Sequence, residues 1–167
     1  TDCIYLSLGH LFKNGYRPDL VISGINIGAN MGEDITYSGT ASAAMEAVIH
    51  GVPAIAISQV CKDMCRSIVV DWDFELACKV VLELVSKIKN GSFPLAERKF
   101  LNVNIPPLKV KDFKGVKITK AGYREYGNDA HRHTNPRGEA YYWIGLHPLR
   151  WKPSLDSSCD FEAIKNG

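Results

Sequence analysis

The segment that most constrains the fold is a stretch rich in glycine and asparagine at residues 23–40, which reads SGINIGANMGEDITYSGT. It follows a short apolar run at residues 20–22 and precedes an alanine-rich stretch at residues 41–50. Flexible, hydrogen-bonding residues therefore gather where a predicted strand ends and a predicted helix begins. Open α/β sheets bind ligands outside the carboxyl ends of their strands. We therefore expect an α/β domain in which this segment is a ligand-binding loop.

The order of the remaining segments predicts a doubly wound sheet. Three segments have helical periodicity and three are short apolar runs. The predicted helices are residues 2–12, 41–50 and 71–90, and the predicted strands are residues 20–23, 54–58 and 101–105. The continuous apolar run of the first strand predicts burial on both faces, as in a parallel sheet. Alternating helices and strands favour a three-layer, mostly parallel α/β sheet, which we assign to residues 1–120.

The pattern changes after about residue 110. Residues 115–119 alternate as a strand does, and residues 139–146 are rich in aromatic side chains, with the polar segment 124–137 between them. Two such runs predict an extended β-hairpin. An aromatic arm with little core of its own often packs against another subunit. We therefore assign residues 121–147 to a β-hairpin oligomerisation arm and residues 148–167 to a truncated C-terminal extension; the alternative is a second strand layer packed within the monomer.

Charge and hydropathy argue against two classes of partner. The net charge is +2 and the local basic excess is confined to residues 124–137, so binding to a nucleic-acid polymer is not expected. No apolar run approaches the roughly 20 residues of a membrane span, and the first residues do not resemble a signal peptide. We expect a protein that does not enter the membrane.

The five cysteines are an odd number, which favours free thiols in a reducing cytoplasm. Cys61 and Cys65 form a C-x3-C pair. A zinc site favours a second such pair or nearby histidines, and neither follows this pair. We therefore expect no zinc site here.

Ser38, Gly39 and Thr40 stand at the predicted start of a helix. The unpaired amides and the positive end of the helix dipole favour an anion at such a place, and the two hydroxyls add donors. Gly39 would let a ligand approach the backbone closely. A bound phosphate is one interpretation; ordinary N-capping by Ser38 or Thr40 is the other, and it needs no ligand.

Asn26 and Asn30 lie four residues apart in the same segment. An asparagine carbonyl oxygen is a neutral, hard ligand that suits Mg²⁺, Mn²⁺ or Ca²⁺. A neutral ligand alone does not hold a divalent ion, and the neighbouring Glu33 and Asp34 are equally compatible with solvated loop charges. Turn formation in the left-handed conformation is the alternative for both asparagines.

Other motifs narrow the chemistry. The glycines are spaced G-x3-G-x3-G, which matches neither the dinucleotide fingerprint nor the P-loop. Ser23 lacks the first glycine of a nucleophile elbow, so we interpret it as a residue at the end of a strand. His131 and His133 are able to orient an anion or exchange protons, or else belong to a solvated loop of the arm.

Taken in order, these motifs resemble the SurE family of survival proteins, which are metal-dependent nucleoside-monophosphate phosphatases. The resemblance extends beyond the glycine-rich segment to nearly the whole chain. The matching positions are residues 18–26, Gly28, Asn30, Gly32, residues 37–40, 43–46 and 53–58, and further residues 1–3, 101–106, 136–138, 142–145 and 160–164.

The resemblance implies hydrolysis of nucleoside 5′- and 3′-monophosphates with one divalent ion, Mg²⁺ or Mn²⁺, in each subunit. It implies that Asn26 is a metal ligand, beside two adjacent aspartates and a serine, and that Ser38, Gly39, Thr40 and Asn30 bind the substrate phosphate. It also implies a homo-dimer or homo-tetramer in which the arm at residues 121–147 packs against a neighbour.

The sequence departs from the family pattern at its ends. No Asp-Asp-Gly segment occurs in the chain, and in the family the first strand, the first helix and a serine-bearing loop would precede Thr1. The family also continues beyond the position of Gly167. We therefore expect a fragment that holds about half of the metal site. The alternative function is a non-catalytic module that binds a nucleotide or phosphate, or that mediates oligomerisation.

Overall fold

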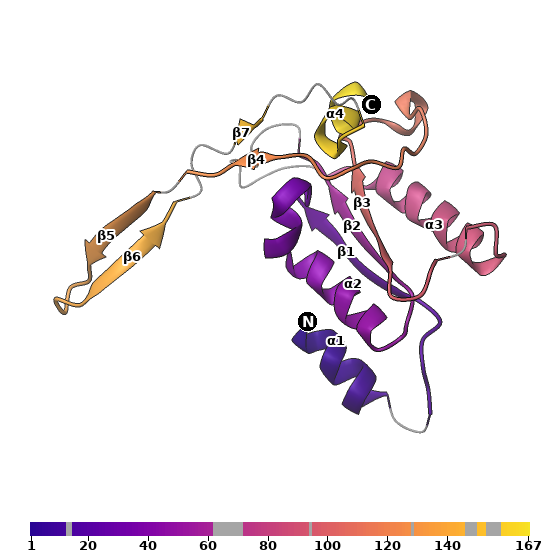
Figure 1. Cartoon of the computed structure of the whole chain (residues 1–167), viewed down its shortest axis with the longest axis horizontal. Helices are drawn as coiled ribbons and strands as arrows, with labels where there is room; N and C mark the ends of the chain where they lie inside the picture. The colour runs from indigo at the N-terminus through magenta and orange to yellow at the C-terminus, as the bar shows by residue number, and fades with distance from the viewer. Residues whose placement is uncertain (13–14, 62–71, 94, 128, 146–149, 153–157) are drawn as a thin grey trace.

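A three-layer α/β domain forms the centre of the computed structural model, which describes residues 1–12, 15–61, 72–93, 95–127, 129–145, 150–152 and 158–167 (Figure 1). The three strands of its sheet are parallel and lie in the order β1 (Val21–Ile27), β2 (Ala54–Gln59), β3 (Phe100–Ile105). Helix α2 (Gly39–Ile49) covers one face and helix α3 (Glu75–Lys89) covers the other. The predicted three-layer, mostly parallel α/β sheet is confirmed.

The central strand β2 explains why the core has two sides. Every residue of β2 is buried, and its alanines face α2 whereas its isoleucines face α3. The small alanines let α2 approach the sheet closely, and the larger side chains fill the opposite layer. The buried cluster on the α2 side contains Ala44, Ala47, Val48, Val52, Ala54 and Ala56; that on the α3 side contains Ile55, Ile57, Leu76, Ala77, Val80, Leu84 and Ile105.

Strand β1 differs from the prediction in length and in burial. It continues to Ile27, so residues 23–27 are strand rather than loop. The prediction that its apolar run is buried on both faces is wrong, because Ile22 is 46% exposed. β1 lies at the edge of the described sheet with β2 as its partner, so one side of it lacks the cover that a central strand receives.

The predicted helix at residues 2–12 is present but changes type. Helix α1 (Asp2–Leu6) passes into a π-helical turn, η1 (Ser7–Leu11), which ends at Phe12. Ile4 and Leu8 pack against the cluster on the α2 side, whereas Leu11 and Phe12 are exposed. The regular helical spacing of the sequence predicts that Ile4, Leu8, Leu11 and Phe12 share one apolar face. This prediction is wrong for Leu11 and Phe12, because the wider π turn changes their spacing.

Helix α3 begins at Glu75 in the structure, and the predicted start at residue 71 lies outside the described residues. Leu76, Val80 and Leu84 are buried as their spacing predicted. Helix α3 and β3 therefore confirm the corresponding predictions for the core.

A β-hairpin projects away from the sheet (Figure 1). It consists of β5 (Ala130–Thr134) and β6 (Ala140–Ile144), which are antiparallel, and a second pair, β4 (Arg124–Glu125) with β7 (Arg150–Trp151), lies at its base. The hairpin falls within the predicted arm, but the predicted first strand at residues 115–119 is wrong, because the structure shows no strand there. The polar segment supplies β5 instead; that strand is exposed throughout, so no burial pattern marked it.

The C-terminal residues form helix α4 (Asp160–Asn166) beside the sheet, and a short 3₁₀ turn, η3, spans Val110–Asp112.

Cys61 is disulfide-bonded, so the prediction of free thiols is wrong for this residue. Cys3, Cys78 and Cys159 are free, and Cys65 lies outside the described residues. Within the described ranges, no helix has the length and apolar character needed to cross a membrane.

Candidate functional site

A row of polar residues crosses the carboxyl edge of the sheet. The strand register aligns Asn26 of β1 with Ser58 of β2, and Ser58 with Asn104 of β3. Residues aligned in this way share a face of the sheet. Ser58 lies two residues after Ala56, so it is on the same face as the alanines that face α2. Helix α2 ends shortly before β2 begins at the opposite edge, so its first turn lies at the carboxyl edge as well. The polar row and the start of α2 therefore share one end of the domain.

A bulge in β1 directs Asn26 to this row. The register between β1 and β2 shifts between Ser23 and Asn26. Gly24 lies in the shifted stretch with φ 124°, and a Cβ at this position would lie 2.3 Å from the carbonyl oxygen of Ile57. Bulges of this kind re-aim side chains next to functional sites. Gly24 therefore has a structural reason to be glycine, and the orientation of Asn26 depends on it.

Asn26 presents an amide oxygen that is available to a ligand. Its Nδ2 donates to the carbonyl oxygen of Gly28 at 2.9 Å. This bond turns Oδ1 away from Gly28, and among the described residues nothing donates to Oδ1. The geometry is compatible with a neutral oxygen ligand, and the role of Asn26 as a metal ligand stays a prediction.

Asn30 fastens the loop after β1 to the other two strands. Its Nδ2 donates to Oγ of Ser58 at 2.7 Å, and its backbone N–H donates to Oδ1 of Asn104 at 2.9 Å. Its carbonyl oxygen accepts from Nδ2 of Asn102 at 2.9 Å and from Nδ2 of Asn104 at 3.1 Å. Asn30 is also buried, at 7% exposure. These contacts give it a structural role, and its binding of a phosphate stays a prediction.

The predicted alternative of left-handed turn asparagines is wrong. Among the described residues other than glycine, positive φ occurs at Arg98 alone. Asn26 is part of a strand, and Asn30 is held by three side chains from neighbouring strands. The sequence showed that these asparagines were unusual but gave no signal for the partners of Asn30, which lie 28 to 74 residues away.

Ser38 caps helix α2, and the next two amides remain unpaired. Oγ of Ser38 accepts from the backbone N–H of Ala41 at 3.0 Å, so the N-capping interpretation is confirmed for this residue. No described residue accepts from the N–H groups of Gly39 and Thr40. A Cβ on Gly39 would meet no atom within 4 Å, so the space beside the first turn is open. Such a turn offers two donors and the positive end of the helix dipole to an anion.

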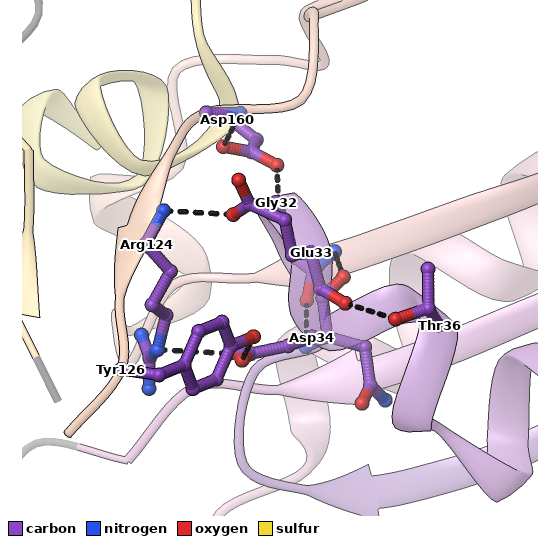
Figure 2. Close-up of polar contacts among 10 residues, drawn as sticks. Gly32, Glu33, Asp34, Thr36, Arg124, Tyr126 and Asp160 are labelled. Atoms are coloured by element: carbon purple, nitrogen blue, oxygen red, sulfur yellow. Dashed lines mark hydrogen bonds and ion pairs between the residues drawn. The ribbon is translucent and has the colours of Figure 1, made fainter. Parts of the chain in front are cut away.

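Glu33 and Asp34 are not solvated loop charges, because both are bonded to residues at the base of the arm. They belong to a 3₁₀ helix, η2 (Gly32–Tyr37), that lies against the base of the arm (Figure 2). Oε2 of Glu33 accepts from the backbone N–H of Arg124 at 2.7 Å. Asp34 accepts from the hydroxyl of Tyr126, and its Oδ2 lies 3.2 Å from Nε of Arg124 in an ion pair. Sequence reasoning missed these partners because they lie about ninety residues away.

The surroundings of Tyr126 shift the pKa of its hydroxyl. Burial, and then the hydrogen bond and the negative charge of Asp34, raise the pKa of Tyr126 above its ordinary value of 10.0. The phenol therefore stays protonated and donates to Asp34 across the neutral range.

Two other predicted candidates lie elsewhere. His131 and His133 are exposed on β5, and the ring of His133 stacks on Tyr141 with centroids 5.5 Å apart. They are strand residues of the hairpin rather than a loop. Ser23 lies in β1 in register with Ala56, which agrees with its interpretation as a strand residue.

The described residues do not complete a metal site by themselves. They contain no group of three or more His, Cys, Asp or Glu side chains arranged to hold an ion. At the carboxyl edge they supply the neutral oxygen of Asn26, while the first two carboxylates that follow it along the chain, those of Glu33 and Asp34, are engaged with Arg124 and Tyr126. One neutral oxygen does not hold a divalent cation.

A comparison with protein families identifies the family of this chain. Residues 1–128 match the family model described as Survival protein SurE. The chain belongs to the SurE family. The 5′-nucleotidase SurE of Aliarcobacter butzleri is 73% identical over 165 residues, which are 99% of this chain and 63% of that protein. The 5′-nucleotidase SurE of Nitratiruptor is 54% identical over 167 residues, which are 100% of this chain and 64% of that protein.

A solved SurE structure has the same architecture. The crystal structure of the SurE protein from Aquifex aeolicus matches with a TM-score of 0.72 and 39% sequence identity, covering 99% of this chain and 62% of that one. This chain thus spans less than two thirds of the length of each of these three SurE proteins.

Proposed function

We propose that this SurE-family protein is a phosphomonoesterase that hydrolyses nucleoside 5′-monophosphates, and also 3′-monophosphates, to a nucleoside and phosphate. The observation that carries the proposal is the convergence of two features at one edge of the sheet. One is the open first turn of α2 with its unpaired amides at Gly39 and Thr40, and the other is the available Oδ1 of Asn26. The relatives named 5′-nucleotidase SurE support the substrate class.

In this proposal the first turn of α2 binds the phosphoryl group. The amides of Gly39 and Thr40 donate to phosphoryl oxygens, and the helix dipole stabilises the negative charge that develops during transfer. The hydroxyl of Ser38 accepts from Ala41, which fixes the turn, and its own proton remains available to a phosphoryl oxygen. Gly39 has no side chain, so the substrate reaches the backbone.

We also propose that activity requires a divalent cation, Mg²⁺ or Mn²⁺, one in each subunit, with Oδ1 of Asn26 as one ligand. Such an ion would act as a Lewis acid. The other ligands would come from outside the described residues, because these contain no group of three or more His, Cys, Asp or Glu side chains that could hold an ion. Because the described donor set is incomplete, a non-catalytic module that binds a nucleotide or phosphate is the second candidate function.

The hairpin supports a proposal about assembly. Tyr142, Trp143 and Ile144 of β6 are 65%, 67% and 77% exposed. A row of large exposed apolar side chains on a projecting hairpin is typical of a protein interface. We propose that the arm packs against a second copy in a homo-dimer or homo-tetramer.

A cytoplasmic location is also part of the proposal. The free thiols of Cys3, Cys78 and Cys159 favour it, and the disulfide at Cys61 does not.

The direct test is the release of phosphate from adenosine 5′-monophosphate by the complete protein with added Mn²⁺ or Mg²⁺. We expect Asn26→Ala to lower activity by about tenfold or more and to raise the metal concentration needed for half-maximal rate. Asn166→Ala is the matched control, because Asn166 is exposed at the end of α4 and, among the described residues, its Nδ2 donates to the carbonyl oxygen of Glu162 alone, within that helix. Full activity in Asn26→Ala would remove Asn26 from the metal site. No phosphate release by the wild type, with nucleotide still bound, would favour the binding module.

A further inference from the structure

The 3₁₀ helix η2 connects the loop that follows β1 to the first turn of α2. It lies between Asn30, which anchors the loop to the sheet, and Ser38, which caps α2. The backbone N–H of Ser38 donates to the carbonyl oxygen of Ile35 at 3.2 Å, so the last turn of η2 is bonded directly to the cap residue. The position of η2 therefore sets the position of the first turn of α2.

Residues at the base of the arm hold the outer side of η2 (Figure 2). Arg124 makes two contacts, because its backbone N–H donates to Glu33 and its guanidinium pairs with Asp34. The side chains of Arg124 and Asp34 are only 15% and 19% exposed, so the pair is shielded from bulk water. Tyr126 adds a third contact by donating its hydroxyl to Asp34. Nε of Arg124 has no hydrogen-bond partner among the described residues, so its contact with Asp34 is an ion pair without an aligned hydrogen bond. An ion pair that is shielded in this way is screened less by water and salt than a pair on the surface.

The guanidinium of Arg124 is itself held in place. It lies over the ring of Trp151 with 4.4 Å between the guanidinium carbon and the ring centroid. Trp151 in turn stacks on Phe161 of α4 with centroids 5.0 Å apart. The planar guanidinium is suited to stacking and ion pairing at the same time, which a lysine would not reproduce.

A second anchor holds the beginning of η2. The buried carboxylate of Asp160 accepts from the backbone N–H of Gly32 at 2.8 Å and from the backbone N–H of Gly122 at 2.9 Å. A Cβ on Gly32 would lie 2.6 Å from the carbonyl oxygen of Gly122, so the two backbones are in close contact. The chain that enters the arm thus lies directly against η2.

We propose that Arg124 and Tyr126 are positioning residues for catalysis: through Glu33 and Asp34 they hold η2, and with it Ser38 and the first amides of α2, in the arrangement that receives the phosphoryl group. This inference rests on the proposed phosphatase function. It makes the base of the arm part of the site's support, so a displacement of the arm is transmitted to the phosphate-binding turn.

The test compares Arg124→Gln, Arg124→Lys and Tyr126→Phe in the complete protein. The controls are Arg98→Gln and Tyr16→Phe, which change exposed side chains of the same types far along the chain from the network. One measurement is kcat and KM for adenosine 5′-monophosphate. The other is amide hydrogen exchange at residues 38–42, where the hydrogen-bonded N–H groups of Ser38, Ala41 and Ser42 report the order of the turn without any need for activity.

We expect Arg124→Gln to lower kcat/KM by roughly 10- to 100-fold, with a clear rise in KM. Even a small displacement of the first turn of α2 would make it bind and orient the phosphoryl group poorly. Exchange at residues 38–42 should quicken by about tenfold or more. Tyr126→Phe should act in the same direction with a smaller effect, and Arg124→Lys should restore part of the loss because it keeps the charge. The two controls should match the wild type.

A merely structural role gives a different pattern. Destabilisation alone lowers the folded fraction and hence the apparent kcat, while KM and the exchange at residues 38–42 in the folded protein stay as in the wild type; that result would overturn the proposal. If Arg124→Gln does not fold, Tyr126→Phe and Arg124→Lys decide by the same criteria. If the wild type releases no phosphate, the proposed function fails, and hydrogen exchange alone then decides whether Arg124 and Tyr126 order the turn.

Discussion

Replacing Gly24 by alanine tests the bulge that orients Asn26. The residue has φ 124°, a region almost confined to glycine, and holding an alanine there costs about 1–3 kcal/mol. The new Cβ would also lie 2.3 Å from the carbonyl oxygen of Ile57 and 3.0 Å from its Cγ2, an overlap that costs roughly a further 1–3 kcal/mol. The sum is about 2–6 kcal/mol. This is a large part of the free energy of unfolding of a typical domain, which is roughly 5–15 kcal/mol.

Alanine substitutions at two other glycines separate the cost of the backbone conformation from the cost of the contact with Ile57. Gly28 has φ 106° but open space around a Cβ, so Gly28→Ala should show the backbone cost alone, about 1–3 kcal/mol. Gly39 has neither a positive φ nor a neighbour within 4 Å, so Gly39→Ala should be neutral or should stabilise the helix by up to about 1 kcal/mol. Urea unfolding of the complete protein, followed by circular dichroism, should therefore give the lowest midpoint for Gly24→Ala, an intermediate one for Gly28→Ala and a wild-type value for Gly39→Ala.

The comparison between the first two variants is decisive. An equal loss of stability in Gly24→Ala and Gly28→Ala would mean that the contact with Ile57 is not close, and the account of the bulge would be refuted. Activity adds a second criterion, because a displaced Asn26 should lower phosphate release in whatever Gly24→Ala protein folds.

Three further predictions concern other parts of the structure. Ser58→Ala removes the acceptor for Nδ2 of Asn30 at a fully buried position and should cost about 1–3 kcal/mol in urea unfolding, whereas Ser86→Ala on the exposed face of α3 should cost almost nothing. The raised pKa of Tyr126 means that, above about pH 10, the folded protein retains a proton that the unfolded chain has lost; stability therefore falls as pH rises, and the fall between about pH 8 and about pH 10.5 should be smaller in Tyr126→Phe. Trp143→Ser, at a side chain that is 67% exposed, should lower the sedimentation coefficient of the assembled protein, and an unchanged oligomer would remove this residue from the interface.

The core was predictable because its signals are local. Three such signals are the unbroken apolar run of β2, the four-residue spacing of Leu76, Val80 and Leu84, and the serine before the start of α2. Each of them depends on a few neighbouring residues. Their physical meaning does not change with what lies far along the chain. These segments therefore appear in the structure nearly as predicted.

The errors occurred where a distant partner decides the outcome. Ile22 has the sequence of a strand residue buried on both sides, yet it is exposed because β1 lies at the edge of the described sheet. β5 gave no signal because both of its faces are exposed. Asp34 was indistinguishable from a solvated charge, since its partners Arg124 and Tyr126 lie about ninety residues further along the chain.

The proposed function depends on the binding of the substrate's phosphoryl group by the backbone amides in the first turn of α2. The most direct test is kcat/KM for adenosine 5′-monophosphate in Gly39→Ala of the complete protein, measured beside its urea midpoint. A Cβ at the first position of a helix points back toward the N-terminus, into the open space where the phosphoryl group would lie. If these amides bind the phosphoryl group, kcat/KM should fall by about 100-fold with no loss of stability. Full activity in a stable Gly39→Ala protein would contradict it.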